Sequence, residues 1–383
     1  MDYFLNEEQQ MIKDICRQIT EERIKPVRAE LDEKEIFPSD ILKEIGQSDL
    51  FRLFIPEEYG GMGTGIFEVC LATEELSRGC LSVATSYAAS GLGFLPILIS
   101  GSEEQKKKYL PDLASGKKLA AFGLTEPEAG SDAGGIKTKA ENKGDHYIIN
   151  GTKQWITNGG EADIYTIFAM TDPQRGSRGA SAFILEKGME GFEFGKKENK
   201  MGIRASATRE LIFNNCKVPA ENIIGREGMG FLVAMKTLDN SRPAVGAQAV
   251  GVAQGALEEA LGYAKIRRQF DSTIASFQAV RHMLADMATK VEAARNLVYH
   301  SAKVVDSGSK DVSRISAMAK MFASDIAMEV TTDAVQIFGG YGYMKEYPVE
   351  KMMRDAKILQ IYEGTNQIQR DVIGLDLVKK GFN

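Results

Sequence analysis

The sequence predicts an α+β protein in which a helical N-terminal domain, a small central β domain and a C-terminal helical bundle follow one another. Apolar residues recur with a helical period up to about residue 120, then in short β-type runs, and then again in long helical runs. At 383 residues the chain is long enough for two or three domains. We expect them at residues 1–120, 121–228 and 229–383.

In the first 120 residues, the run from Asn6 to Glu30 has the apolar spacing of an amphipathic helix that packs on a core. Further helices are expected at Phe67–Leu76 and Ser102–Leu113. The glycine-rich loop Pro56–Gly65 lacks a full GxGxxG register and no strand pattern precedes it, so we interpret it as a structural turn. Between the helices, Tyr87–Phe94 is rich in small residues, which allow another backbone or a ligand to approach closely.

The central part has the period and turn residues of β structure. The runs Tyr147–Ile149 and Trp155–Thr157 flank Asn150-Gly151, a pair typical of a β-hairpin turn, so we expect a hairpin there. Four more short strands are expected at Ile164–Met170, Ala180–Leu185, Phe192–Phe194 and Glu210–Phe213. Together they predict a small sheet or barrel.

The C-terminal part reads as long helices. Asp239, Asn240 and Ser241 offer N-cap oxygens and Pro243 suits a first turn, so a helix is expected from about Val245 to Ala264. Three more helices are expected at about 274–307, 311–338 and 347–359. Segments of this length rich in Ala, Leu, Met and Val favour a helical bundle.

Composition excludes several classes of function. The net charge of −6 disfavours a nucleic-acid partner, which needs clustered Lys and Arg. The four cysteines and three histidines have no metal-ligand, redox or catalytic-triad spacing, so no metal is expected. The N-terminus carries acids where a signal peptide needs bases, and no apolar run approaches the length of a membrane span. We therefore expect a cytoplasmic protein.

Glu363 is the candidate general base. It follows the mostly apolar Ile358–Ile361 and sits between an aromatic residue and a glycine. A carboxylate in apolar surroundings loses hydration, and its pKa can rise by several units from about 4.3, toward what proton abstraction at neutral pH requires. The alternative is that Glu363 opens the next helix, where a carboxylate favours the positive end of the dipole.

Four stretches in register carry a family resemblance. They are Gly123-Leu-Thr-Glu-Pro-Glu-Ala-Gly-Ser-Asp132 followed by Gly135, then Trp155–Gly159, then Gln336–Tyr343 with Glu346, Lys351 and Asp355, and finally Ile361–Gln367. In order and spacing they resemble the signatures of the acyl-CoA dehydrogenase family, and the helical N-terminus with its Glu-Tyr-Gly-Gly loop is similar too. The resemblance covers essentially the whole chain, and it implies the family fold with a C-terminal four-helix bundle.

The resemblance implies a specific chemistry. An acyl-CoA dehydrogenase converts a saturated acyl thioester into the 2-enoyl form by removing a proton from the α carbon and a hydride from the β carbon. FAD is the implied cofactor and takes the hydride at N5, since no side chain accepts two electrons. Glu363 would take the proton, while its backbone N–H and a ribityl hydroxyl of FAD would stabilise the developing enolate.

The resemblance also assigns binding residues. Those expected to contact the flavin are Leu124, Thr125, Trp155, Ile156 and Thr157, with Thr365, Asn366 and Gln367 also at FAD and Ser131 between the pyrophosphate and CoA. Those expected to hold the adenylate half of a neighbouring subunit's FAD are Arg267, Phe270, Gln278, Gln336, Gly339 and Gly340. Those expected at the substrate are Ser131, Asp239, Arg242 and Gly364. A cofactor shared across an interface implies a homotetramer.

Some positions depart from the family pattern. Certain relatives carry the base one residue before the position of Arg242, where this chain has Ser241, so Glu363 is the only candidate. The small residues Ala88, Ala89, Ser90, Gly91 and Gly93 replace bulkier ones of straight-chain relatives. We expect a short- to medium-chain substrate, with either a wider pocket for a branched or cyclic acyl group or simply close helix packing.

The motifs do not distinguish between possible electron acceptors. The resemblance makes electron-transferring flavoprotein the expected acceptor. An enoyl-CoA reductase or an acyl-CoA oxidase would share the same motifs, and so would a non-catalytic acyl-CoA-binding scaffold.

Overall fold

The computed structural model describes residues 3–381, and its first part is helical. Its α-helices are α1 (Glu7–Ile19), α2 (Arg28–Glu33), α3 (Ser39–Gln47), α4 (Ile66–Gly79), α5 (Leu81–Ser100) and α6 (Glu103–Ala114). Asn6 starts α1 with a capping box: the Asn6 side chain accepts from the Gln9 backbone N–H, and the Gln9 side chain accepts from the Asn6 backbone N–H. A π-helical turn, Thr20–Ile24, follows α1, so the expected helix to Glu30 is split.

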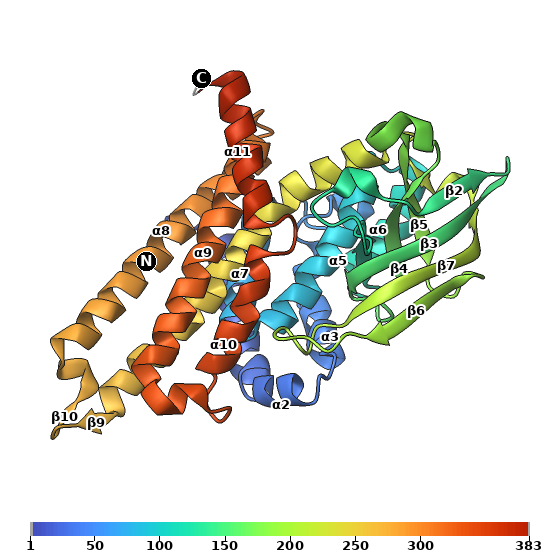
Figure 1. The fold of residues 1–383 in the computed structure, drawn as a ribbon. Helices are drawn as coiled ribbons and strands as arrows, with labels where there is room; N and C mark the ends of the chain where they lie inside the picture. The colour runs from blue at the N-terminus through green and yellow to red at the C-terminus, as the bar shows by residue number, and fades with distance from the viewer. Residues whose placement is uncertain (1–2, 382–383) are drawn as a thin grey trace.

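Helix α5 passes through the stretch of small residues Tyr87–Phe94. It is long and apolar enough to cross a membrane by length and composition, but 72% of its most apolar window is buried inside the protein. We therefore interpret α5 as a core helix, one face of which packs on strand β1 (Ala120–Gly123). In Figure 1, α5 lies between the sheet and the bundle.

The central part forms one eight-stranded sheet (Figure 1). The strands that follow β1 are β2 (Lys139–Asn142), β3 (His146–Thr157), β4 (Ile164–Met170), β5 (Ala180–Glu186), β6 (Phe192–Lys197), β7 (Thr208–Pro219) and β8 (Ile223–Ile224). Their order is β6-β7-β3-β2-β4-β5-β8, with β1 parallel to β4. The long strand β3 pairs with both β2 and β7, and it carries Trp155 and Thr157 at its C-terminal end.

The hairpin expected at Asn150-Gly151 is wrong, because both residues lie inside β3. The register between β3 and β7 shifts between Ile149 and Gly151, which marks a bulge rather than a turn. Gly151 has a φ of 145°, and a Cβ there would lie 2.8 Å from the Thr138 Cα. Asn150 accepts a hydrogen bond from the Asn215 N–H at 2.7 Å. The positive φ of Gly151 and its lack of a side chain therefore allow close contact with the segment around Thr138.

The last part is a bundle of long helices. They are α7 (Gly230–Ile266), α8 (Gln278–Asp306), α9 (Val312–Phe338), α10 (Val349–Ala356) and α11 (Asn366–Lys380), with the short strands β9 (Arg268–Gln269) and β10 (Ser272–Thr273) after α7. Figure 1 shows α7 running from the side of the sheet into the bundle. The helix start expected at 239–243 is wrong, because α7 begins at Gly230 and continues through Pro243. Of the polar residues that suggested a cap, Ser241 instead bonds Glu363 and Asp239 pairs with Arg242.

Candidate active site

Glu363 lies in a tight turn between a 3-10 turn, Lys357–Gln360, and α11. The turn has positive φ at two successive residues, 52° at Glu363 and 91° at Gly364. The hydroxyl of the preceding Tyr362 donates to Gln248 Oε1 on α7. Glu363 therefore does not open α11; Thr365 is the N-cap of that helix, and its side chain accepts from the Ile368 N–H.

The carboxylate of Glu363 faces α7. Ser241 Oγ donates to Glu363 Oε2 at 2.6 Å. Burial raises the pKa of Glu363 above its ordinary value, while the Ser241 hydroxyl and the charges of Arg242 and Lys320 oppose the rise. A carboxylate whose pKa is raised by burial has the character of a general base.

Glu363 lines a cleft of about 160 Å³ between the sheet, α5 and α7. The cleft collects seven of the expected site residues: Leu124, Thr125, Trp155, Ile156, Thr157, Glu363 and Gly364. The cleft is also lined by residues that were not predicted from the sequence, among them Thr85, Phe122, Leu238 and Gln248. The end of β3, the segment after β1 and the Glu363 turn thus meet at one place.

On the side of the sheet, a buried ion pair between Lys153 and Glu126 supports the residues that line the cleft. Lys153, fully buried on β3, donates to the Leu124 carbonyl at 3.0 Å and to Glu126 Oε1 at 2.7 Å. Burial alone would raise the pKa of Glu126, but the charge and hydrogen bond of Lys153 hold it below its ordinary value. The Glu126 carboxylate also accepts from the Lys137 N–H and the Thr138 N–H. This pair therefore fixes Leu124 and Thr125, which line the cleft.

Trp155 forms an aromatic wall of the cleft. Its side chain is 59% exposed, and its backbone φ is 56°. A tryptophan that is largely exposed beside a pocket is unusual for a core residue and typical of a ligand platform. With the hydroxyls of Thr125 and Thr157 beside it, the lining fits a flat cofactor that has apolar faces and polar edges.

The expected substrate residues Asp239 and Arg242 lie on α7 next to Ser241. Arg242 is 4% exposed and donates from Nη1 to Asp239 Oδ1 at 2.6 Å. Its Nε has no hydrogen-bond partner among the described residues, which leaves one buried donor for a ligand. Ser131 is exposed on the loop before β2 and does not line the cleft.

The residues expected to bind a neighbour's FAD gather elsewhere. Arg267, Gly339 and Gly340 line a groove of about 470 Å³ at the C-terminal end of α7. Phe270 is 89% exposed, and Gln278 and Gln336 are exposed as well. From Ser241 to Ile266, α7 spans roughly 38 Å at about 1.5 Å per residue, so this groove is separate from the cleft of the same chain.

The three residues after Gly364 have different surroundings. Thr365 caps α11 and Gln367 is exposed. Asn366 is buried, and its side chain bonds Ser324 Oγ and Asp325 Oδ1 on α9 and accepts from Lys320. Its amide group is therefore engaged within the protein.

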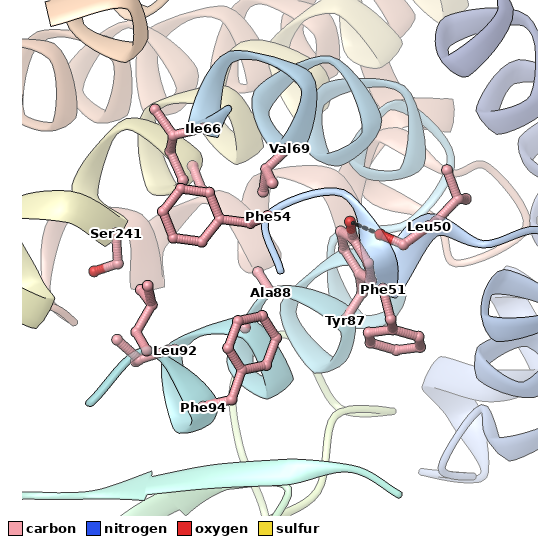
Figure 2. A pocket seen from close by; sticks show the side chains of 13 residues that line it. Leu50, Phe51, Phe54, Ile66, Val69, Tyr87, Ala88, Leu92, Phe94 and Ser241 are labelled. Carbon is pink, nitrogen blue, oxygen red and sulfur yellow. Dashed lines mark hydrogen bonds between the residues drawn. The ribbon is translucent and has the colours of Figure 1, made fainter. Parts of the chain in front are cut away.

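A second, apolar pocket is shown in Figure 2. The pocket measures about 40 Å³, and its lining includes Phe54, Ile66 and Val69. Ala88 and Leu92 line both the pocket and the cleft, and Ser241, the partner of Glu363, lies at its edge. The pocket thus opens beside the carboxylate.

The stretch of small residues on α5 serves two purposes. Ser90 Oγ accepts from the Ala120 N–H at 2.9 Å, and a Cβ at Gly93 would lie 2.5 Å from the Ala121 nitrogen. These two residues permit close packing of α5 on β1. Ala88 and Gly91 instead line the apolar pocket, and a Cβ at Gly91 would meet no atom within 4 Å.

Three polar residues of the site do not belong to any of the sequence motifs. Lys153, Lys320 and Gln248 are all buried. Lys320 lies within the mostly apolar Ala317–Ala323, and this local pattern could have indicated a buried lysine. Nothing near it in the sequence indicates that it contacts the turn of Glu363 and Gly364. Within residues 3–381, no group of three or more His, Cys, Asp or Glu side chains could hold a metal ion.

Comparison with known protein families covers nearly the whole chain. Three family models match: acyl-CoA dehydrogenase, N-terminal domain at residues 6–117, middle domain at 121–216 and C-terminal domain at 228–377. The chain belongs to the acyl-CoA dehydrogenase family. It is therefore an enzyme of an oxidoreductase family, and the expected family and fold class are confirmed.

Curated relatives give the same result. A probable acyl-CoA dehydrogenase of Mycobacterium tuberculosis is 51% identical, over 98% of this chain and 96% of that protein. A short-chain specific acyl-CoA dehydrogenase of Clostridium acetobutylicum is 50% identical, over 97% of this chain and 98% of that one. An acryloyl-CoA reductase (NADH) of Anaerotignum propionicum is 46% identical, over 99% of this chain and 97% of that protein.

Solved structures extend the likeness to the fold. Butyryl-CoA dehydrogenase from Megasphaera elsdenii has a TM-score of 0.96 and 48% identity, over 99% of this chain and all of that one. A chain from work on the electron transferring flavoprotein of Acidaminococcus fermentans has a TM-score of 0.97 and 52% identity, over 99% of this chain and 100% of that one. An acyl-CoA dehydrogenase of Bacillus anthracis complexed with FAD has a TM-score of 0.93 and 38% identity, over 98% of this chain and 67% of that one. FAD is thus confirmed as the cofactor of the family.

The raised pKa of Glu363 predicts an effect on stability. Because its folded-state pKa lies above its unfolded value near 4.5, burying the ionised carboxylate destabilises the fold above the folded-state pKa, and the penalty vanishes below about pH 4.5. Glu363→Gln should raise the Tm of the FAD-loaded protein at pH 8 by a few degrees, since about 1 kcal/mol corresponds to about 2–4 °C. The gain should shrink as the pH falls.

Thermal unfolding at several pH values tests this expectation. Glu190→Gln, at an exposed position before β6, removes a carboxylate without the burial and serves as the control. A Tm for Glu363→Gln equal to or below wild type at pH 8 would show that the carboxylate is not destabilising in its site.

Proposed function

We propose that this protein is a short-chain acyl-CoA dehydrogenase that oxidises a saturated acyl-CoA to the 2-enoyl-CoA. Glu363 removes the proton from the α carbon, and its backbone N–H polarises the thioester carbonyl. FAD, when bound, supplies the acceptor for the hydride of the β carbon. The observation that carries the proposal is that Glu363 lines the same cleft as Trp155 and Thr157.

The chain's own residues have distinct parts in this proposal. Leu124, Thr125, Trp155 and Thr157 would hold the flavin in the cleft that Glu363 also lines. The N–H of Glu363 donates to no acceptor within residues 3–381, so it is free to bind an oxygen on which negative charge develops. Arg242, with its free Nε and its Asp239 partner, is placed to contact the CoA part.

The size of the apolar pocket supports a short acyl chain. A pocket of about 40 Å³ has room for about one to three water-sized groups. Most of its walls are large side chains such as Phe54 and Leu92, and its small lining residues are Ala88, Gly91, Ser241 and Ala244. The C. acetobutylicum and M. elsdenii relatives, described as short-chain specific and as a butyryl-CoA dehydrogenase, support the same preference.

The electron acceptor we propose is an electron-transferring flavoprotein. The support is the likeness to the chain from the A. fermentans work on such a flavoprotein. The reverse reaction is the second candidate, because the A. propionicum relative is an acryloyl-CoA reductase at 46% identity. Both directions use the same cleft and the same base.

A panel of acyl-CoA substrates tests the proposed function. We expect kcat/KM to be highest for butyryl-CoA and to fall for hexanoyl-CoA, in graded steps because a methylene group changes discrimination by about 1–3 kcal/mol. Isobutyryl- and cyclohexanecarboxyl-CoA test whether Ala88 and Gly91 leave room for a wider group. A preference for these two over butyryl-CoA would contradict the straight short-chain assignment. Electron-transferring flavoprotein and oxygen serve as competing acceptors.

The groove at the end of α7 leads to a proposal about assembly. Arg267 lines it, stacks over the Tyr341 ring at 5.2 Å and forms no ion pair within the described residues. We propose that in a homotetramer this groove receives part of a neighbour's FAD. Arg267→Ala should lower FAD content about 10-fold or more, since a hydrogen bond to a charged group contributes about 1.5–3 kcal/mol. The tetramer should weaken with it.

Size-exclusion chromatography together with the flavin-to-protein ratio measures both effects. Lys265→Ala, an exposed position two residues earlier, is the matched control. Full FAD retention by Arg267→Ala would contradict a shared site.

A further inference from the structure

The turn that carries Glu363 has a backbone that needs support. Glu363 and Gly364 both have positive φ, and a residue with a side chain adopts that conformation only at a cost in free energy. Such a conformation persists where the surrounding structure holds it. The contacts of this turn are therefore part of what keeps Glu363 in the cleft.

Two side chains bond the carbonyl groups of the turn. Gln369, on α11, donates from Nε2 to the Glu363 carbonyl at 3.2 Å and to the Gly364 carbonyl at 3.0 Å. Lys320, on α9, donates from Nζ to the Gly364 carbonyl at 2.8 Å and to Asn366 Oδ1 at 2.9 Å. The turn is thus anchored to two helices of the bundle.

Lys320 is fully buried and forms no ion pair within residues 3–381. Both of its acceptors are neutral oxygens. Gln369 bonds the same Gly364 carbonyl with a neutral amide, so the hydrogen bond by itself does not require a charge. A buried ammonium without a carboxylate in contact is costly and tends to lose its proton, so a lysine that keeps its charge here needs an explanation beyond the hydrogen bond.

The charged groups around Lys320 supply that explanation. They are Glu363 on the turn, Arg242 on α7 and Asp325 on α9 itself. Arg242 pairs with Asp239 at 2.6 Å, and Asp325 pairs with Arg370 of α11 at 3.0 Å. Lys320 and Glu363 remain as opposite charges that have no ion-pair partner of their own among residues 3–381.

We propose that Lys320 is a positioning residue for proton abstraction, which fixes the turn through the Gly364 carbonyl and provides the positive charge that keeps the Glu363 carboxylate ionised in its buried site. The inference rests on the proposed role of Glu363 as the base. Burial raises the pKa of Glu363, and Lys320 is one of the groups that oppose this rise. Burial lowers the pKa of Lys320 itself to about 7, so its charge acts at neutral pH and below.

The pH dependence of turnover separates this role from simple support of the turn. Lys320→Gln keeps an N–H donor and removes the charge. We expect the acid-side limb of the kcat profile to move up by about one pH unit, because a nearby opposite charge lowers a carboxyl pKa by about that much or more. Lys320→Arg keeps the charge and should leave the limb in place. Lys357→Gln, at an exposed position near the turn, is the control.

Two outcomes of this experiment would overturn the proposal. One is a loss of turnover in Lys320→Gln that is equal at every pH, with the limb unmoved. The other is a limb that moves as far in Lys320→Arg as in Lys320→Gln, because the charge would then not be the cause.

A second measurement does not depend on turnover. It compares the Tm at pH 7 of FAD-loaded wild type, Glu363→Gln, Lys320→Gln and the double variant. The Tm gain from Glu363→Gln should be larger in the Lys320→Gln background, where the carboxylate has lost its opposing charge. Equal gains in both backgrounds would overturn the proposal. Failure of the base assignment would show separately, as substantial turnover by Glu363→Gln with Lys320 intact.

Discussion

Glu363→Gln is expected to keep its FAD and to lose turnover by about 10²- to 10⁴-fold. The amide fills the same space as the carboxylate but cannot accept the α proton, and loss of a general base typically costs this much. The measurement is kcat with butyryl-CoA and an artificial electron acceptor, on protein whose flavin content equals that of wild type.

The matched control for this variant is again Glu190→Gln, which removes an exposed carboxylate outside the cleft. It should turn over at the wild-type rate. Activity of Glu363→Gln above about half of wild type would remove Glu363 from its assigned role, and with Ser241 at the alternative position the chain would need another base.

The second large effect is expected from the buried pair under the cleft. Lys153→Met leaves the Glu126 carboxylate, 5% exposed, without its counter-charge. Removing one partner of a buried ion pair destabilises a protein by about 3–5 kcal/mol. Because Lys153 also bonds the Leu124 carbonyl, the flavin side of the cleft should loosen, and FAD content should fall together with the stability.

Chemical unfolding and the flavin-to-protein ratio measure this effect. Lys139→Met, on the exposed face of β2, is the control and should change stability by less than about 0.5 kcal/mol. Adding Glu126→Gln to Lys153→Met removes the unpaired charge and should recover part of the loss. A midpoint for Lys153→Met equal to that of Lys139→Met would show that the pair does not support the cleft.

The order of helices, strands and helices could be predicted from the sequence because it depends on local periodicity. The strand expected at Ile164–Met170 has those bounds in the structure. The predictions were wrong where residues with a typical local role, such as a turn or a helix cap, make tertiary contacts instead. Asn150-Gly151 has turn chemistry, but Gly151 lies against Thr138 within a continuous strand. Asp239 to Pro243 has cap chemistry, but these residues lie inside α7, where Ser241 bonds Glu363 and Asp239 pairs with Arg242.

The candidate site shows the same limit. Residues within a motif, such as Thr125, Trp155, Thr157 and Glu363, could be found because a motif is a run of neighbours in sequence. Their supports could not, because each acts across a long sequence distance. Lys320 reaches Gly364 from 44 residues away, and Lys153 reaches Leu124 from 29. Nothing in the sequence near either lysine shows what it contacts.

The most direct test of the account is anaerobic mixing of the purified yellow protein with butyryl-CoA while the visible absorption of the flavin is followed. The account predicts that wild type bleaches and releases the 2-enoyl-CoA, whereas Glu363→Gln, loaded with the same amount of FAD, keeps its colour on the same time scale. A wild-type protein that binds FAD and stays yellow with every acyl-CoA of the panel would contradict the account and leave a binding scaffold as its function.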